Sequence, residues 1–99
     1  MANYILLINF TAQGVHNIED STNRAAAVTA LGKKMKVKVK DIYWCLGAHD
    51  GVLVAEASDD ESMTAFALSI ASLGNVRIET LRAFKAGEFK SIVGKMRTL

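Results

Sequence analysis

The run Tyr4-Ile-Leu-Leu-Ile-Asn-Phe10 constrains the fold more than any other segment of the chain. It is rich in β-branched and aromatic residues and has no polar face, which predicts a strand that is buried on both sides. Successive residues of a strand point to opposite faces of its sheet, and here Ile5 is as apolar as Leu6. A sheet built around this strand therefore needs cover on both faces.

The next segments predict a helix and a hairpin. Apolar residues at helical spacing predict a first helix over residues 22–35. Alternation with period two predicts a strand over residues 37–46, in which a change of phase near Asp41 indicates a β-bulge. A further strand is expected over residues 52–57. The turn cluster Gly47-Ala-His-Asp-Gly51 between these strands predicts an antiparallel hairpin.

The second half of the chain predicts one more long helix and one more strand. Ser58-Asp-Asp-Glu61 resembles a capping box, in which the Ser58 hydroxyl accepts a hydrogen bond from the amide of Glu61. An apolar stripe follows it, consisting of Met63, Phe66, Ala67, Ile70, Ala71 and Leu73. Gly74 is expected to end this helix in a left-handed conformation. Residues 76–84 alternate as a last strand, and a short amphipathic helix is expected around residues 89–96.

The order β-α-β-β-α-β with a tail helix predicts an α+β fold of the ferredoxin-like type. In this fold a four-stranded antiparallel sheet carries both helices on one face. One domain over residues 1–99 is expected, because chains divide only well beyond about 200 residues. The apolar content of 51% is high for so small a domain. We therefore expect a second copy to cover the bare face, in a homodimer or larger oligomer that resembles a dimeric α/β barrel.

Composition and charge exclude several kinds of partner. A formal net charge of +2 is too small for the broad positive surface of a nucleic-acid-binding protein. The one dense run of charge is expected to be the solvated face of a helix end and a strand, and consists of Lys33, Lys34, Lys36, Lys38 and Lys40. Residues 4–10 are too few to span a bilayer, and no targeting signal is found. Neither a nucleic acid nor a membrane is therefore expected as a partner.

The supply of reactive side chains is also small. The single Cys45 excludes an internal disulfide and a zinc site with several thiolates, so a reducing cytoplasm is the expected compartment. The two histidines, His16 and His49, have no spacing that resembles a metal site. The chain has no glycine-rich phosphate loop and no nucleophile elbow. We expect no metal and no cofactor, and whether the protein is an enzyme stays open.

Four parts of the chain resemble the GYD domain family, and together they span nearly its whole length. They are Tyr4-Ile-Leu-Leu-Ile-Asn-Phe-Thr11, Val39-Lys-Asp-Ile-Tyr-Trp-Cys-Leu-Gly47, Asp59-Asp-Glu61 with Ala65-Phe-Ala67, and Leu73-Gly-Asn-Val-Arg-Ile-Glu-Thr-Leu-Arg-Ala-Phe84. The Gly-x-Tyr-Asp motif that names the family is here Gly47-Ala48-His49-Asp50, so histidine stands in place of tyrosine. The resemblance implies a ferredoxin-like fold related to the dimeric α/β-barrel proteins and implies no particular activity.

His49 in this motif is the strongest candidate for chemistry. An imidazole transfers protons near neutral pH, and the adjacent Asp50 carboxylate would orient it. Both are therefore candidate catalytic residues. The alternative is structural, because glycine and aspartate are common in tight hairpins for conformational reasons alone.

Four further residues are candidate ligand-binding groups. Tyr43 is expected on the sheet face opposite the core residue Trp44, where its hydroxyl contacts either a ligand or a partner subunit. Asn9 is a polar side chain in an apolar strand and needs hydrogen-bond partners if it is buried. Arg77 and Glu79 share one face of the last strand, where they either pair with each other or anchor a ligand.

Three hypotheses for function follow. The leading one is a cytoplasmic, homo-oligomeric module that binds a small molecule or has a regulatory role, with a cavity lined by the sheet. The alternative is a cofactor-independent enzyme, isomerase or oxygenase-like, with His49 as base, which resembles what some dimeric α/β-barrel relatives do. The third is a structural interaction protein.

Overall fold

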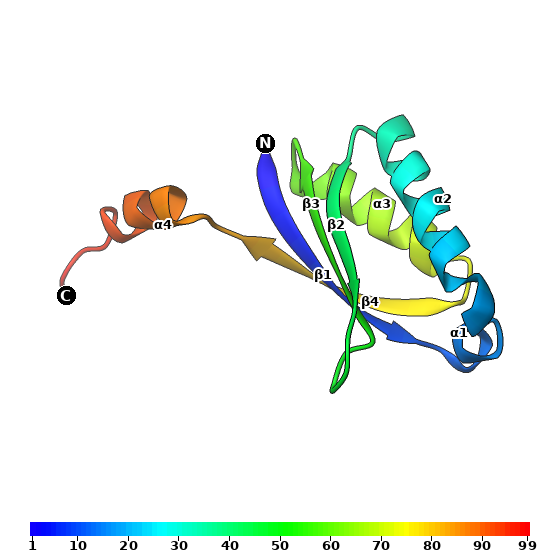
Figure 1. The fold of residues 1–99 in the computed structure, drawn as a ribbon. Coiled ribbons are helices and arrows are strands. Elements are labelled where there is room, and N and C mark those ends of the chain that lie inside the picture. The colour runs from blue at the N-terminus through cyan, green and yellow to red at the C-terminus, as the bar shows by residue number, and fades with distance from the viewer.

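The computed structural model describes residues 1–99, and its main elements follow the predicted order (Figure 1). The strands are β1 (Ala2–Phe10), β2 (Lys38–Trp44), β3 (Gly51–Ala57) and β4 (Val76–Ala83). The helices are α1 (Ala12–His16), α2 (Ser21–Lys34), α3 (Asp60–Ala71) and α4 (Ala86–Val93), with a 3-10 turn η1 (Ile18–Asp20) before α2. The polar stretch after β1 thus contains two short helical segments that the periodicity does not predict.

The four strands form one antiparallel sheet in the order β2-β3-β1-β4. Helices α2 and α3 lie on the same side of this sheet, as Figure 1 shows. This arrangement confirms the predicted ferredoxin-like α+β fold. The register between β2 and β3 shifts between Val39 and Asp41, which confirms the predicted bulge.

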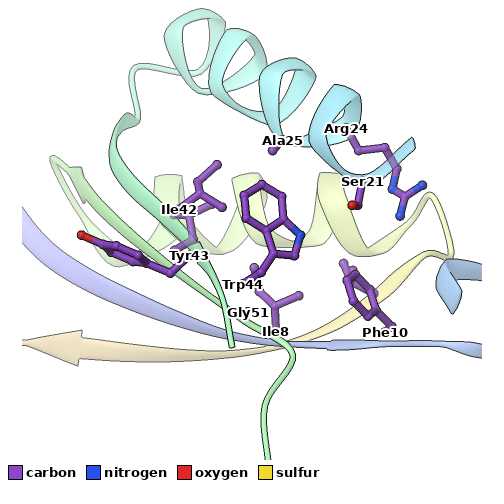
Figure 2. A pocket seen from close by; sticks show the side chains of 11 residues that line it. Ile8, Phe10, Ser21, Arg24, Ala25, Ile42, Tyr43, Trp44 and Gly51 are labelled. Carbon is purple, nitrogen blue, oxygen red and sulfur yellow. The ribbon is translucent and has the colours of Figure 1, made fainter. Parts of the chain in front are cut away.

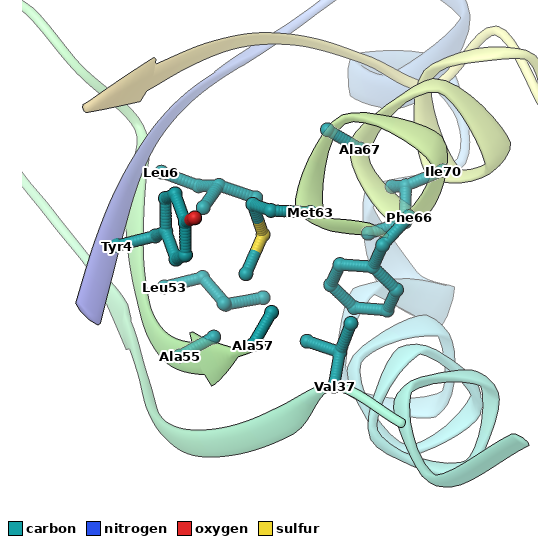
Figure 3. Close-up of a cluster of buried hydrophobic side chains, with 10 residues drawn as sticks. All are labelled: Tyr4, Leu6, Val37, Leu53, Ala55, Ala57, Met63, Phe66, Ala67 and Ile70. Atoms are coloured by element: carbon teal, nitrogen blue, oxygen red, sulfur yellow. The ribbon is translucent and has the colours of Figure 1, made fainter. Parts of the chain in front are cut away.

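The core lies between the sheet and the two helices (Figure 3). It consists of ten buried residues: Tyr4, Leu6, Val37, Leu53, Ala55, Ala57, Met63, Phe66, Ala67 and Ile70. Glycine allows α2 to approach this core closely, because a Cβ at Gly32 would lie 2.7 Å from the carbonyl oxygen of Val37. The C-terminal half of α2 therefore packs tightly against the sheet.

Two details of α3 differ from the prediction. Asp59, not Ser58, is the N-cap, and its carboxylate accepts a hydrogen bond from the amide of Ser62 at 2.8 Å. Both residue types cap helices well, so the sequence alone allows either. Leu73, predicted as part of the apolar stripe, lies beyond the last turn of α3 and is 65% exposed. Gly74 has the predicted positive φ, at 85°.

The opposite face of the sheet is apolar and is not covered by either long helix. Ile5 and Leu7 of β1 lie on this face, between Val54 and Val52 of β3 and the residues of β4. Leu81 of β4 pairs with Ile5 there and is 37% exposed. We call this surface, formed by Ile5, Leu7, Val52, Val54 and Leu81, the open face.

Helix α4 projects from the end of β4, as Figure 1 shows, and contacts the sheet through Glu88, which accepts a hydrogen bond from Asn3 at 3.3 Å and pairs with Arg82. The chain is consequently elongated, with extents of 52 × 31 × 19 Å. Its radius of gyration is 15.2 Å, against roughly 13 Å for a compact chain of this length. Phe89 and Val93 of α4 are 56% and 46% exposed, so its apolar side has no partner within the chain. None of the helices has the length and apolar composition needed to cross a membrane.

We expect Phe66→Ala to lower the free energy of unfolding by about 3–5 kcal/mol, because it removes the largest fully buried side chain and leaves a cavity. The matched control is Leu68→Ala on the same helix, where the side chain is 64% exposed and the loss should stay below about 0.5 kcal/mol. Urea unfolding at one protein concentration measures both values. Equal losses for the two variants would contradict this description of the core.

Candidate functional site

A pocket of about 80 Å³ lies between the first half of α2 and one end of the sheet (Figure 2). The sheet contributes mainly apolar side chains to it: Ile8, Phe10, Ile42 and Trp44. Helix α2 contributes Ser21, Arg24 and Ala25. The pocket exists because its walls carry small residues where a core would carry large ones. Ser21 and Ala25 are one helical turn apart on α2, and Gly51 of β3 has no side chain.

Trp44 lies on the helix side of the sheet, as its phase predicts, but it is not a core residue. Its side chain is 49% exposed because it borders the pocket. It is also the only tryptophan of the chain, so its fluorescence reports on this pocket alone. Sequence periodicity identifies the face of a strand and does not show that the opposing helix leaves space there.

Arg24 has a hydrogen-bonding requirement that the chain itself does not meet. Its Nη1 donates to the carbonyl oxygen of Asn17 at 2.7 Å. Its Nη2 is closed off from solvent and has no hydrogen-bond partner, and it is the only buried side-chain nitrogen or oxygen in this condition. A charged donor that is buried without a partner costs free energy. In the sequence, Arg24 is one more polar residue of the predicted helix, and no pattern singles it out.

The structure brings His49 and Asn9 together, although they are far apart in the sequence. Nδ1 of His49 lies 2.9 Å from Oδ1 of Asn9, and Nδ2 of Asn9 donates to the carbonyl oxygen of Ala48 at 2.8 Å. Because an amide oxygen only accepts, the proton of this contact belongs to Nδ1. The Nε2 atom of His49 has no hydrogen bond within the chain and is free to accept one.

Asp50 makes its hydrogen bonds to the backbone and not to His49. Its Oδ2 accepts from the amide of Phe10 at 2.8 Å, and its own amide donates to the carbonyl oxygen of Ile8 at 2.8 Å. Its carbonyl oxygen accepts from the amide of Cys45. Asp50 therefore fastens the hairpin loop to the end of β1, and Asn9 is the residue that orients the histidine.

The remaining predicted site residues lie on or beside the open face. Tyr43 pairs with Val52, is 56% exposed and is one of the residues that line the pocket, but its hydroxyl points away from Trp44 in Figure 2. Arg77 pairs with Asn9 across the sheet and Glu79 pairs with Leu7. Arg77 and Glu79 form no ion pair; the two ion pairs of the chain are Lys40–Glu56 at 3.2 Å and Arg82–Glu88 at 3.4 Å.

A second, polar pocket of about 240 Å³ surrounds the hydroxyl of Tyr4. This hydroxyl donates to Asp60 at 2.6 Å, and the Arg82 guanidinium lies 5.6 Å from the centre of the Tyr4 ring. Burial, and then the nearby Asp60 carboxylate, raise the pKa of Tyr4 to about 12. In the sequence, Tyr4 is only part of a predicted strand and Asp60 only part of a predicted helix start, so this contact between them is not predicted. No group of three or more His, Cys, Asp or Glu side chains is placed to hold a metal ion.

The strand order and the two helices on one face define a ferredoxin-like α+β domain, which has a small apolar pocket beneath α2. The family model of the GYD domain matches residues 4–93, and the chain therefore belongs to the GYD domain family. This confirms the resemblance seen in the sequence.

Two solved structures have the same fold. TTHA0845 from Thermus thermophilus is 30% identical, and the match covers 87% of this chain and 96% of that chain with a TM-score of 0.55. MtbAldR is 16% identical with a TM-score of 0.61, and the match covers 85% of this chain but only 52% of that chain. The second likeness shows the fold alone. Among curated proteins, none matches this chain.

The raised pKa of Tyr4 predicts a loss of stability in alkaline solution. The folded chain keeps the Tyr4 proton up to about pH 12, whereas the unfolded chain releases it near pH 10.0. Raising the pH through this interval therefore favours the unfolded chain, and the free energy of unfolding should fall. Urea unfolding at a series of pH values measures the slope. Tyr4→Phe should flatten it and Tyr43→Phe should not; an unchanged slope in Tyr4→Phe would contradict the assignment.

Proposed function

We propose that this chain is the subunit of a homo-oligomeric, cytoplasmic domain that binds a small, mostly apolar molecule between α2 and the sheet. The pocket beneath α2 is the observation that carries the proposal. Eight of its eleven lining residues are hydrophobic, and a concave apolar site with a few polar groups is what small ligands bind. The exposed, unpaired Cys45 supports a reducing compartment.

Self-association is supported by two apolar surfaces with no partner in the chain. The open face presents five aliphatic side chains from three adjacent strands, and the apolar side of α4 lies away from the domain. An exposed apolar area of this kind marks an interaction site. A second copy offers both surfaces at once, since α4 of each subunit is free to pack against its partner while the two open faces meet.

An enzymatic alternative rests on the contact between His49 and Asn9. Asn9 fixes the imidazole ring by its Nδ1 atom and leaves Nε2 free, which is how a histidine is oriented to act as a base. No carboxylate is hydrogen-bonded to the His49 ring, because the Asp50 carboxylate accepts from the backbone of β1 instead. Binding is therefore the better supported function, and a purely structural interaction protein would leave the pocket without a role.

The pocket is tested by titrating two neutral apolar probes, cyclohexanol and 3-methylbutanamide, while the fluorescence of Trp44 is followed. We expect saturable binding, and we expect Ala25→Leu to weaken it at least tenfold because the larger side chain fills the pocket. Ala27→Leu, the same change at an exposed position of α2, should leave binding unchanged. If no probe, neutral or charged, changes the emission of Trp44 or the melting temperature, the proposed binding function is wrong.

Self-association is tested by sedimentation equilibrium at micromolar concentration. We expect a dimer or a larger oligomer for the parent chain, and a shift toward monomer for Phe89→Glu, which places a charge in the apolar side of α4. Leu68→Glu is the matched control, because Leu68 is also exposed on a helix but lies on neither surface. A monomeric parent chain would remove this part of the proposal.

A further inference from the structure

We propose that the ligand of the pocket beneath α2 is a short apolar carboxylic acid, whose carboxylate pairs with the guanidinium of Arg24. This inference rests on the proposed function and adds the chemical class of the ligand. It starts from the one buried polar atom of the chain that has no partner, Nη2 of Arg24.

One terminal nitrogen of the Arg24 guanidinium is hydrogen-bonded, and the other is not. The bond from Nη1 to the carbonyl oxygen of Asn17, 2.7 Å long, holds the group at the end of the pocket. Nη2 lies on the same planar group and has no acceptor around it. A guanidinium binds a carboxylate through parallel N–H groups, and such charge-assisted bonds are about twice as strong as neutral ones. Nη2 is closed off from solvent in the free chain, so binding of the acid requires the flexible Arg24 side chain to turn toward the pocket, where Nη2 would donate to the entering carboxylate.

The other polar and charged groups of the pocket favour an anion as well. Arg24 is the only charged residue among those that line it, so no carboxylate of the protein competes for the guanidinium or repels an acid. Ser21 lies three residues before Arg24 on α2, which places both side chains on one face of the helix. The Ser21 hydroxyl has no hydrogen bond within the chain and supplies a second donor for the same carboxylate.

The apolar residues of the pocket determine the chemical character and the size of the rest of the ligand. Phe10, Ile42 and Trp44 offer no hydrogen-bonding partner except the indole N–H, so the part of the ligand that lies against them is hydrocarbon. The volume of about 80 Å³ is roughly half that of an apolar cavity that holds a benzene molecule. The pocket therefore encloses only a hydrocarbon group of a few carbon atoms, and the remainder of a short acid extends out of it, whereas a long-chain fatty acid would leave most of its chain in water.

The test compares 3-methylbutanoate with 3-methylbutanamide, which has nearly the same shape but no charge, by titration against Trp44 fluorescence at pH 7. We expect the acid to bind at least tenfold more tightly than the amide to the parent chain. Arg24→Met should abolish this preference and leave the affinity for the amide within about twofold. Arg77→Met, which removes an exposed arginine on the other side of the sheet, should keep the preference.

The outcomes separate this inference from the proposed function. Equal binding of acid and amide to the parent chain, or binding of the amide and cyclohexanol alone, would overturn the inference and leave the apolar pocket in place. Absence of binding by all three probes would overturn both. Because Arg24→Met also removes the bond to Asn17, Arg24→Lys serves as a second variant: it should fold with a similar melting temperature and retain part of the preference through its charge.

Discussion

A strand presents its residues alternately to the two faces of its sheet, and the arrangement of this molecule depends on that constraint. The central strands β1 and β3 carry apolar residues in both phases, and two helices can cover only one face. The covered face forms the ten-residue core, and the other face remains apolar toward solvent. The apolar side of helix α4 is also left without cover, because β4 extends beyond the sheet and places α4 at its end. The proposed association with a second copy would cover both surfaces.

The contrast between the two halves of α2 explains how a tightly packed domain contains a pocket at all. Toward its C-terminus, Val28 and Leu31 pack on the core, and Gly32 allows the helix backbone to lie close to Val37. Toward its N-terminus, the residues that face the sheet are Ser21 and Ala25, which are too small to reach it. Large residues at one end and small ones at the other leave a wedge of space beneath the first turns. A pocket in this position therefore arises mainly from the sequence of one helix, together with the missing side chain at Gly51 of β3.

The sequence predicts a structural feature well when the residues that form it are close together along the chain. Strands, long helices and the bulge near Asp41 follow from the spacing of neighbouring apolar residues, and the predicted bounds of α2 lie within one residue of the observed ones at each end. The partner of His49 cannot be predicted in this way, because it depends on the alignment of the hairpin loop with the end of β1, 40 residues away. Arg24 escapes sequence analysis for the same reason: an unpaired nitrogen is visible only when its whole surroundings are known.

The two candidate sites are the hairpin loop around His49 and the pocket beneath α2. They differ in whether they contain a polar group without a hydrogen bond, and this difference favours one of them as the place for a ligand. In the hairpin loop, Asn9 and Asp50 already make hydrogen bonds to the backbone around them, so a ligand there would have to replace existing bonds. Beneath α2, by contrast, the proposed ligand would add a bond to Nη2 of Arg24, which has no partner to lose. Binding free energy is the difference between bonds gained and bonds given up. The loop therefore holds its own shape, and under the proposed function the pocket is the place where a ligand would supply the acceptor that Nη2 lacks.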